Sequence, residues 1–529
     1  MGQTKLDDRQ TEAVETVEGQ WLVISGAGSG KCVKGDSLVL GNSGLKRIDE
    51  FGKESCELKS ELPVFDLEKR SFRSGKSSHW YKLDKSPVIR IETKSGFSIT
   101  GTYEHPILVL NEKGDLEFRR LDRIRTGDVA TLAFNTQIFG DNRVGQDMAY
   151  LMGLLLGDGH AYKGTIGFSK WDVRVEVLFR SLIRRLFGYE NIKSCYRKTD
   201  PKRHSVTHHV HSVKIKKKLE GLGLYLGCGA SNKVVPHSIL SAVKEDQVAF
   251  LQGLCDTDAG VHGLTFEYST ASFELAKQVQ LMLMNMGVRT VFTEKMVKGV
   301  MYFRLQCMGT ALRRFSDQVG FRGAIQKQER LEKAINRPAN TNVDVLYNQR
   351  YRFKRMRKDF VGKPWWDAHE QRVIQPKMSL KDYFGGRRNP SRQRCFEVAN
   401  LIPDNEDARY LIDLATNFWF DPIKKIIPIA KKFDVYDFTI PDTHSFIANG
   451  FVNHNTKTLT HRVGRLIQKG ASPSEMLVFT FTNDAANEMK TRLMAIVGDH
   501  IQTLNVGTIH SQLNRMLRES IAMWKPHMR

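Results

Sequence analysis

Short apolar runs and helical spacings alternate along the chain. Residues 21–25 (WLVIS) form an apolar run before a Gly-rich turn, which predicts a buried strand that enters a tight loop. The expected helix is not found directly after this loop. Instead, apolar side chains recur at helical spacing from Leu459 to Ile467, and Gly470 marks the end. The two ends of the chain therefore form one strand–loop–helix pattern that is interrupted by residues 32–455.

The interrupting residues carry two further patterns. Residues 86–101 (SPVIRIETKSGFSITG) are rich in strand-forming positions. Residues 150–160 (YLMGLLLGDGH) and 250–260 (FLQGLCDTDAG) lie 100 residues apart, and both contain apolar-x-Gly-Leu with an acid four positions after the leucine. Each motif alone suits an amphipathic core helix. Their repetition instead predicts two related halves.

Length and charge narrow the class of protein. A chain of 529 residues with 41% hydrophobic residues is expected to fold into several domains. The 80 basic and 58 acidic residues give a formal charge of +22, which favours a polyanion such as nucleic acid as partner. A generally solvated basic surface is the alternative.

Cysteine usage and hydropathy indicate the compartment. The seven cysteines contain no C-x-x-C pair, which argues against a disulfide scaffold or a zinc site and fits a reducing environment. No apolar run reaches the roughly 18 residues that a membrane span needs, and the N-terminus has no signal-peptide pattern. We expect a cytoplasmic protein without membrane contact.

Residues 25–31 (SGAGSGK) have the composition of a phosphate-binding loop. Such a loop needs a Ser or Thr after its lysine, because that hydroxyl holds the Mg²⁺ of the nucleotide. Here Cys32 follows Lys31, whereas joining Lys31 to Thr456 would restore the hydroxyl. The residues expected to bind ATP after joining are Gly26, Gly28, Gly30, Lys31 and Thr456, with Thr456 as the Mg²⁺ ligand.

The joined ends resemble superfamily 1 DNA helicases of the UvrD/PcrA type. Residues 6–14 (LDDRQTEAV) resemble the adenine-reading motif with Gln10 as reader, and residues 477–493 and 506–511 resemble motifs Ia and Ib, which face single-stranded DNA. The resemblance implies a split α/β RecA-like P-loop fragment over residues 1–31 and 456–529. No two acids are adjacent after Thr456, so the paired acidic motif of the motor is missing and the chain is interpreted as a helicase fragment.

The ends of the interruption carry groups for peptide-bond rearrangement. Cys32 stands first, His454 and Asn455 stand last, and Thr456 follows. Together with GTYEHPILV (101–109) and VYDFTIPDTHSFIANG (435–450), these residues resemble an intein of the Hint (hedgehog/intein) type. The resemblance implies an all-β Hint horseshoe in two parts, residues 32–140 and 415–455. Its further site residues would be Thr102, His105, Asp437 and His444.

The implied reaction needs no cofactor. A thiol is a good nucleophile near neutral pH, so Cys32 would attack the Lys31 carbonyl and form a thioester. By resemblance, His105 supplies the proton and Thr102 holds the strained bond. Thr456 would take over the acyl group with Asp437 coordinating the steps, and Asn455 would cyclise with help from the two histidines, His444 and His454. The alternatives are a merely packed His444 and a helicase with a permanent insertion that never splices.

The repeated motifs resemble those of LAGLIDADG homing endonucleases. The resemblance implies an α+β pseudo-two-fold endonuclease over residues 145–335 that acts as a monomer on double-stranded DNA. Asp158 and Asp258 would share Mg²⁺ for phosphodiester cleavage, and Lys233 and Lys327 would support the developing charge. Ala259 replaces the usual glycine after the second acid, and the alternative is a degenerate endonuclease that only binds DNA.

Residues 336–414 remain without a motif. Basic stretches at 214–218 (KIKKK), 350–358 (RYRFKRMRK) and 383–394 (YFGGRRNPSRQR) are candidates for phosphate contacts. The last two stretches lie beyond the repeat. This region is therefore interpreted either as an accessory DNA-binding extension or as a solvated basic linker.

Overall fold

The fold was analysed in a computed structural model of the whole chain, which falls into two compact units. One unit spans Val33–His454, and the other combines Met1–Cys32 with Asn455–Arg529. The structure describes residues 31–170, 172–196, 206–338, 343–360, 381–440 and 443–454. Beyond these it describes 463, 466–467, 470–480, 486–487, 490, 493–494 and 498–524.

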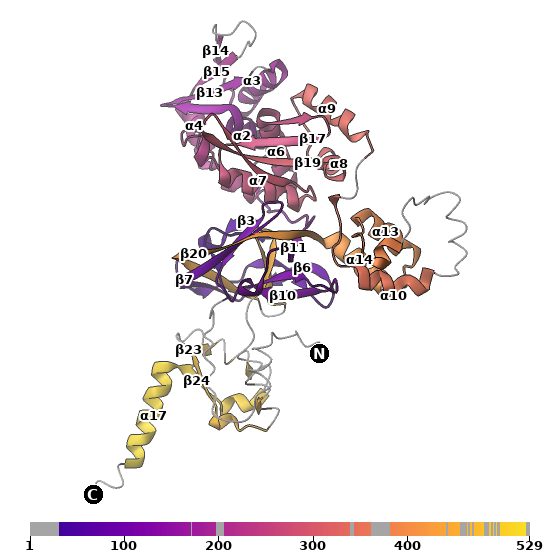
Figure 1. Cartoon of the computed structure of the whole chain (residues 1–529). Coiled ribbons are helices and arrows are strands. Elements are labelled where there is room, and N and C mark those ends of the chain that lie inside the picture. Colours follow the sequence, from indigo (N-terminus) through magenta and orange to yellow (C-terminus); the bar gives the residue numbers. More distant parts are fainter. Residues whose placement is uncertain are drawn as a thin grey trace. The chain divides into compact units, whose positions relative to one another are not determined.

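A 12-stranded antiparallel sheet is built from both ends of the larger unit. Figure 1 shows its indigo strands from residues 33–133 beside orange strands from residues 418–454. The longest pair joins β7 to β20, and the expected β-rich segment 86–101 is confirmed by β7 and β8. The strands are β1 (Val33–Lys34), β2 (Leu38–Gly41), β3 (Gly44–Arg47), β4 (Cys56–Glu57), β7 (His79–Thr93), β8 (Ser98–Gly101), β9 (Pro106–Leu110), β10 (Leu116–Arg120), β11 (Val129–Ala133), β20 (Phe418–Thr439), β21 (Ser445–Ala448) and β22 (Phe451–His454). A separate hairpin joins β5 (Glu61–Asp66) to β6 (Ser71–Lys76).

The duplicated part consists of two halves with the same element order. Each half places a motif helix before a four-stranded antiparallel sheet, in the orders β12-β13-β15-β14 and β16-β17-β19-β18. The first half contains α2 (Gln146–Asp158), β12 (Gly159–Tyr162), β13 (Thr165–Lys170), α3 (Val173–Phe187), β14 (Lys193–Tyr196) and β15 (Val206–His211). The second contains α6 (Lys244–Asp258), β16 (Ala259–His262), β17 (Thr265–Thr270), α7 (Phe273–Asn285), β18 (Val291–Val297) and β19 (Val300–Met308). The expected two related halves are therefore present.

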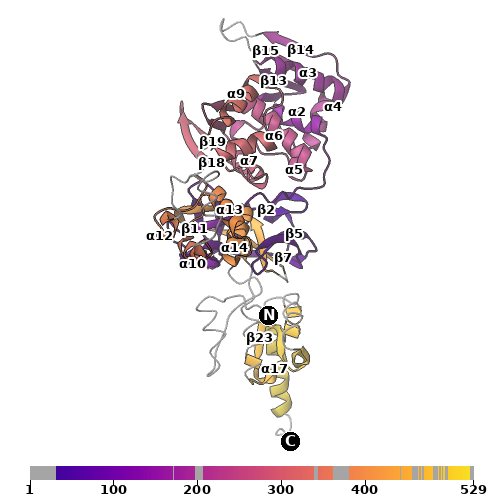
Figure 2. The same ribbon diagram turned by 90° about the vertical axis from the view of Figure 1, so that its right-hand side faces the viewer.

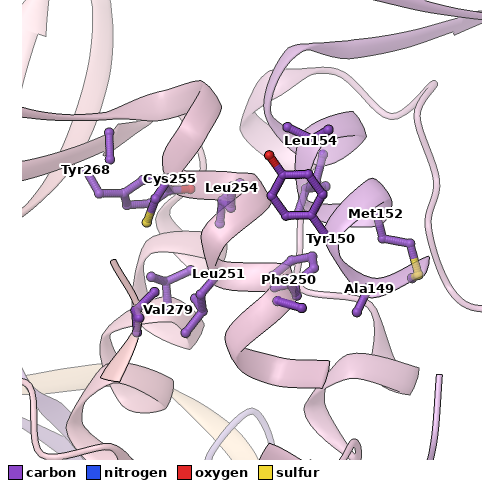
Figure 3. Packing of buried hydrophobic residues seen from close by; sticks show 14 of the residues in the cluster. Ala149, Tyr150, Met152, Leu154, Phe250, Leu251, Leu254, Cys255, Tyr268 and Val279 are labelled. Carbon is purple, nitrogen blue, oxygen red and sulfur yellow. The ribbon is translucent and has the colours of Figure 1, made fainter. Parts of the chain in front are cut away.

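The two motif helices pack against each other in the core of the duplicated part. Side chains of Tyr150 and Leu154 from α2 share one buried cluster with Phe250 and Leu254 from α6 (Figure 3). The same cluster includes Phe168 of β13 and Phe266 of β17, so one core joins both motif helices to both sheets. Further helices complete this part: α4 (Val213–Gly221), α5 (His237–Leu240), α8 (Thr310–Gln318) and α9 (Ile325–Ile335).

A helical module follows the duplicated part. It contains α10 (Arg350–Phe360), α12 (Lys381–Gly385), α13 (Arg392–Leu401) and α14 (Glu406–Asn417), which lie to one side of the large sheet in Figure 1 and in front of it in Figure 2. Buried side chains such as Phe353 and Leu411 share a core with Leu108 and Phe420 of that sheet. The described part of this basic region is thus folded, so it is not an extended linker.

In the smaller unit, β23 (Leu477–Thr480) pairs in parallel with β24 (Asn505–Thr508), and α17 (Ile509–Trp524) follows. A parallel pair is consistent with an α/β arrangement. The predicted strand 21–25 lies outside the described residues, as does most of the predicted helix after residue 456. Among the helices described, none is both long and apolar enough to cross a bilayer.

Candidate functional site

The first strand of the large sheet fixes the start of the interrupting segment. Val33 of β1 pairs with Tyr436 of β20 on one side and with Gly101 of β8 on the other. The sequence neighbours of these two partners are Asp437 and Thr102. Val33, which follows Cys32, therefore lies between Gly101 and Tyr436, the residues next to Thr102 and Asp437.

A turn between β8 and β9, in which Thr102 and His105 are buried, links this start to the last strand. The backbone N–H of His105 donates to the Thr102 carbonyl at 3.0 Å, and β9 follows the turn. The His105 ring Nε2 lies 2.8 Å from Oδ1 of Asn453 on β22, and Asn453 also pairs with Ile107 across the sheet. His105 and Asn453 are fully buried. The turn therefore connects β1, through Gly101, with β22, through the contact between His105 and Asn453.

Of three other predicted site residues, Asp437 and His454 lie in strands β20 and β22 of the same sheet, and His444 directly precedes β21. Asp437 is buried, and its Oδ1 accepts the N–H of Phe438 at 2.9 Å. His444 is buried at a left-handed φ of 53°, and its ring centroid lies 6.1 Å from that of His454. The histidine pair thus stands at the end of β22, directly before Asn455.

Not every predicted residue can be placed. Cys32 and Lys31 are buried. The other predicted splicing and nucleotide-binding residues lie outside the described part: Gln10, Gly26, Gly28, Gly30, Asn455 and Thr456.

Glycines allow the two motif helices to approach closely. A Cβ on Gly153 would lie 2.2 Å from the Phe250 carbonyl oxygen, and one on Gly253 would lie 2.2 Å from that of Tyr150. Real Cβ atoms do not come that close to backbone oxygens, so both positions require glycine. Asp158 and Asp258 are the last residues of α2 and α6. The helix packing therefore brings both acids to one end of the helix pair.

Three lysine ammonium groups converge on these helix ends. Lys170 Nζ lies 2.5 Å from Oδ2 of Asp158 and 3.0 Å from the Thr257 carbonyl oxygen. Lys233 donates to the Gly157 carbonyl at 2.7 Å, and Lys327 donates to the Asp256 carbonyl at 2.8 Å. Positive charge at helix C-termini is favourable because the terminal carbonyls carry partial negative charge.

The electrostatics of this cluster follow from burial and from like charges. Burial, reinforced by the neighbouring Asp158 carboxylate, raises the pKa of Asp258 to about 7. Burial, reinforced by the Lys170 ammonium, lowers the pKa of Lys327 to about 8. The site therefore combines two carboxylates that repel each other with cations that partly compensate them.

The donor set fits a divalent cation only in part. No group of three or more His, Cys, Asp or Glu side chains in the described residues could hold a metal alone. Two carboxylates that destabilise each other's charge nonetheless suit Mg²⁺, which usually takes one or two protein carboxylates and completes its shell with water and phosphate oxygens. Asp158 and Asp258 are the residues that would hold it.

Two residues of this site escaped the sequence analysis. Lys170 has no counterpart in the repeat, because Thr270 stands at the corresponding place 100 residues later. Asp256 accepts the Tyr150 hydroxyl at 2.5 Å and the N–H of Gly323 at 2.6 Å, which ties α6 to the loop before α9. The sequence does contain a signal for Asp256, because it is a second acid in the repeated motif, two positions before Asp258.

The first and last strands of the interrupting segment, β1 and β22, lie in one sheet, as they do in a self-contained inserted domain. The intein splicing domain family matches residues 38–455, more than half of the chain, and the chain belongs to this family. The UvrD/REP helicase N-terminal domain family matches residues 455–527.

Among curated proteins, the chain is similar to parts of two replication proteins. The chain is 28% identical over 439 residues to the replication factor C small subunit of Methanocaldococcus jannaschii, across 78% of this chain and 23% of that protein. It is 24% identical over 487 residues to the replicative DNA helicase DnaB of Synechocystis sp., across 84% of this chain and 52% of that protein. The chain thus spans less than two thirds of the length of either relative.

Solved structures show local similarity. A DnaB intein from Synechocystis sp. PCC 6803 is 22% identical, with 19% of this chain and 68% of that chain covered and a TM-score of 0.17. The structure of I-DmoI in complex with DNA and Mn is 20% identical, with 33% of this chain and 96% of that chain covered and a TM-score of 0.24.

Proposed function

We propose that residues 32–455 excise themselves and join Lys31 to Thr456. The observation that carries this proposal is the register of the large sheet. It places Val33 beside the neighbours of Thr102 and Asp437, and it bonds His105 to Asn453 on the last strand. A passive insertion would not need both of its ends in contact with one buried histidine turn.

The reaction is a sequence of acyl shifts. The Cys32 thiolate attacks the Lys31 carbonyl carbon, the Lys31–Cys32 C–N bond breaks, and the freed nitrogen takes a proton from His105. The Thr456 hydroxyl then displaces the Cys32 thiolate, with Asp437 coordinating the two steps. The Asn455 side-chain amide attacks its own carbonyl and releases the Thr456 amine, assisted by His444 and His454. That amine attacks the new ester and completes the peptide bond, without any cofactor.

Gel analysis after expression tests this proposal. Wild-type chain should yield a free insert of residues 32–455 and a joined product of residues 1–31 and 456–529. Cys32→Ala should block joining, and Asn455→Ala should block release of the insert. A wild-type chain that remains intact on the gel would instead support the permanent insertion.

The same insert cuts double-stranded DNA. This part of the proposal is supported by the packed motif helices, which bring Asp158 and Asp258 to one end together with three ammonium groups. A bound Mg²⁺ would supply Lewis-acid activation of the scissile phosphate. Lys233 and Lys327 hold positive charge beside the carboxylates, where negative charge develops on the phosphate. One acid from each half would serve one strand, and one chain would suffice for a double-strand break.

A plasmid that carries the uninterrupted coding sequence of the joined ends tests the cleavage. With Mg²⁺ the chain should linearise it, and Asp158→Asn with Asp258→Asn should abolish the linear product. Binding without cleavage by the wild type would support the degenerate, DNA-binding endonuclease.

After splicing, the joined ends belong to an ATP-dependent DNA helicase. The UvrD/REP match over residues 455–527 supports this assignment. Lys31 and Thr456 would hold the phosphates and Mg²⁺ of ATP, Gln10 would read the adenine, and residues 477–493 and 506–511 would face single-stranded DNA. ATP binding by the joined product, compared with a Cys32→Ala, Asn455→Ala chain, tests the assignment. Equal affinity would contradict a loop that is completed by splicing.

A further inference from the structure

The helix α10 presents one face of cations that neither proposed reaction uses. Arg350, Lys354, Arg357 and Lys358 are exposed and recur at helical spacing, so they share one side of the helix. These four residues are called the α10 cationic face. In the part of the chain that the structure describes, no ion pair joins any of them to a carboxylate.

The opposite side of α10 is fixed by packing. Phe353 and Met356 are fully buried in the core that the module shares with the large sheet. The buried Arg352 pairs with Asp115 in the turn between β9 and β10 and with Asp407 of α14. Because this side is held by both apolar and charged contacts, the helix cannot rotate its cations inward.

Several acids in and beside the module form ion pairs elsewhere. Five of these carboxylates form an ion pair with an arginine outside the α10 cationic face: Asp344, Asp382, Glu397, Asp407 and Asp413. A basic helix in a solvated surface would usually have its charges balanced by neighbouring acids. Here the arrangement leaves a concentrated positive strip.

Neighbouring side chains shape this strip. A Cβ on Gly386 would lie 2.6 Å from Cδ of Arg350, so the turn after α12 fits closely against the Arg350 side chain. The Arg357 guanidinium lies 5.9 Å from the Phe384 ring centroid. These contacts support the side chains of Arg350 and Arg357, and both residues remain exposed.

We propose that the α10 cationic face binds the phosphate backbone of double-stranded DNA, as a contact separate from the two carboxylates of the cutting site. The choice of DNA rests on the proposed cutting function. From Arg350 to Lys358 the helix rises about 12 Å at 1.5 Å per residue, and one DNA strand carries a phosphate about every 3.4 Å along its axis. Four cations can therefore meet several phosphates of one strand without reading bases.

Salt-dependent binding tests the proposal on the full chain. The chain carries Cys32→Ala and Asn455→Ala to prevent splicing, and binding to a labelled duplex of arbitrary sequence is followed by anisotropy in EDTA. Neutralising the face with Arg350→Gln, Lys354→Gln, Arg357→Gln and Lys358→Gln should lower the slope of log Kd against log salt by about three to four, since each phosphate contact contributes about 0.9.

The matched control removes four exposed lysines of the splicing part: Lys53→Gln, Lys69→Gln, Lys76→Gln and Lys85→Gln. It changes net charge equally and should leave the slope within about one of the parent. Equal slopes for the two variants would overturn the proposal, and so would a loss of RNA binding with duplex binding intact.

Splicing by both variants, made with the natural Cys32 and Asn455 restored, reports correct folding. If the fourfold variant does not splice, Lys354→Gln and Lys358→Gln should each lower the slope by about one.

This test is independent of cutting. A chain that never cleaves DNA can still show or lack the slope change, because the duplex has no target sequence and Mg²⁺ is absent. Failure of cleavage and failure of the α10 contact are therefore distinguishable.

Discussion

Lys170 makes the two halves of the proposed DNA-cutting site unequal. It is 7% exposed and pairs with Asp158 at 2.5 Å, whereas Thr270 occupies the corresponding position at the end of β17. A buried ion pair contributes little net stability but is costly to break on one side. Lys170 is therefore a positioning residue for Asp158 that the second half lacks.

Lys170→Met is expected to slow cleavage of one strand by about 100-fold, as removal of a single charge stabiliser does in other sites. Supercoiled plasmid would then accumulate in the nicked form before linear product appears. Thr270→Val, at the matched position, should leave the ratio of nicked to linear plasmid unchanged. Equal slowing of both strands would contradict the inequality of the halves.

Asp258 should make the metal-free protein less stable at high pH. Its folded pKa of about 7 lies above the unfolded value near 4, so the protonated form favours folding. This stabilisation is complete below pH 4 and is lost as the pH rises through 7. Asp258→Asn should therefore match wild type at pH 4 and exceed it at pH 8 by up to about 4 kcal/mol. Thermal unfolding in EDTA across this range measures the difference, and parallel profiles would contradict the expectation.

Asn453 should control the first splicing step through His105. Asn453→Ala removes the acceptor 2.8 Å from the ring Nε2, so the ring loses a fixed orientation. In an Asn455→Ala background, thiol reagents release residues 1–31 from the thioester. We expect this release to slow by about 10-fold or more, since general acid catalysis contributes about 10² to 10⁴. An unchanged release rate with unchanged unfolding temperature would show that Asn453 does not position His105.

At the scale of elements, the packing of α2 on α6 depends on two glycines. Gly153→Ala should destabilise the duplicated part by about 3 kcal/mol or more, because its Cβ would overlap the Phe250 carbonyl oxygen at 2.2 Å. Gly221→Ala is the control, since that helical glycine has no heavy atom within 4 Å of an added Cβ. The control should be neutral or stabilising by up to about 1 kcal/mol. Denaturant unfolding of both variants checks this difference.

The elements show which features the sequence could predict. The strands β7 and β8 and the helices α2 and α6 were predictable, because strand and helix periodicity and repetition are local properties. Lys170 and Asn453 were not, since their partners Asp158 and His105 are brought near only by the sheet register and helix packing. The helices of the module could not be predicted, because their many charged residues hide the apolar periodicity. Among the described side chains of α10, the only apolar ones that are buried are Phe353 and Met356, and the buried Arg352 resembles a surface residue in sequence.

At the scale of the larger unit, α7 of the duplicated part packs into the core of the splicing sheet. Leu281 and Met284 of α7 belong to the same buried cluster as Trp419 and Phe451 of the sheet. Gln280 donates to the Ser95 carbonyl at 2.9 Å. The helix that supports the second half of the proposed cutting site thereby also supports the splicing sheet.

Met284 connects the duplicated part to the turn before the last splicing strand. A Cβ on Gly450 would lie 2.3 Å from its Cε, and Gly450 directly precedes β22. Met284→Ala should therefore cost about 2–5 kcal/mol through a cavity in the shared core and slow splicing. Met282→Ala is the matched control, because the same side chain on the same helix faces only the core of the duplicated part. Splicing rates on gels and cleavage rates on plasmids separate the two: Met284→Ala should reduce splicing, and Met282→Ala should reduce cleavage while splicing continues. Equal effects of both variants on splicing would contradict a local link through Gly450 and indicate general destabilisation of the unit.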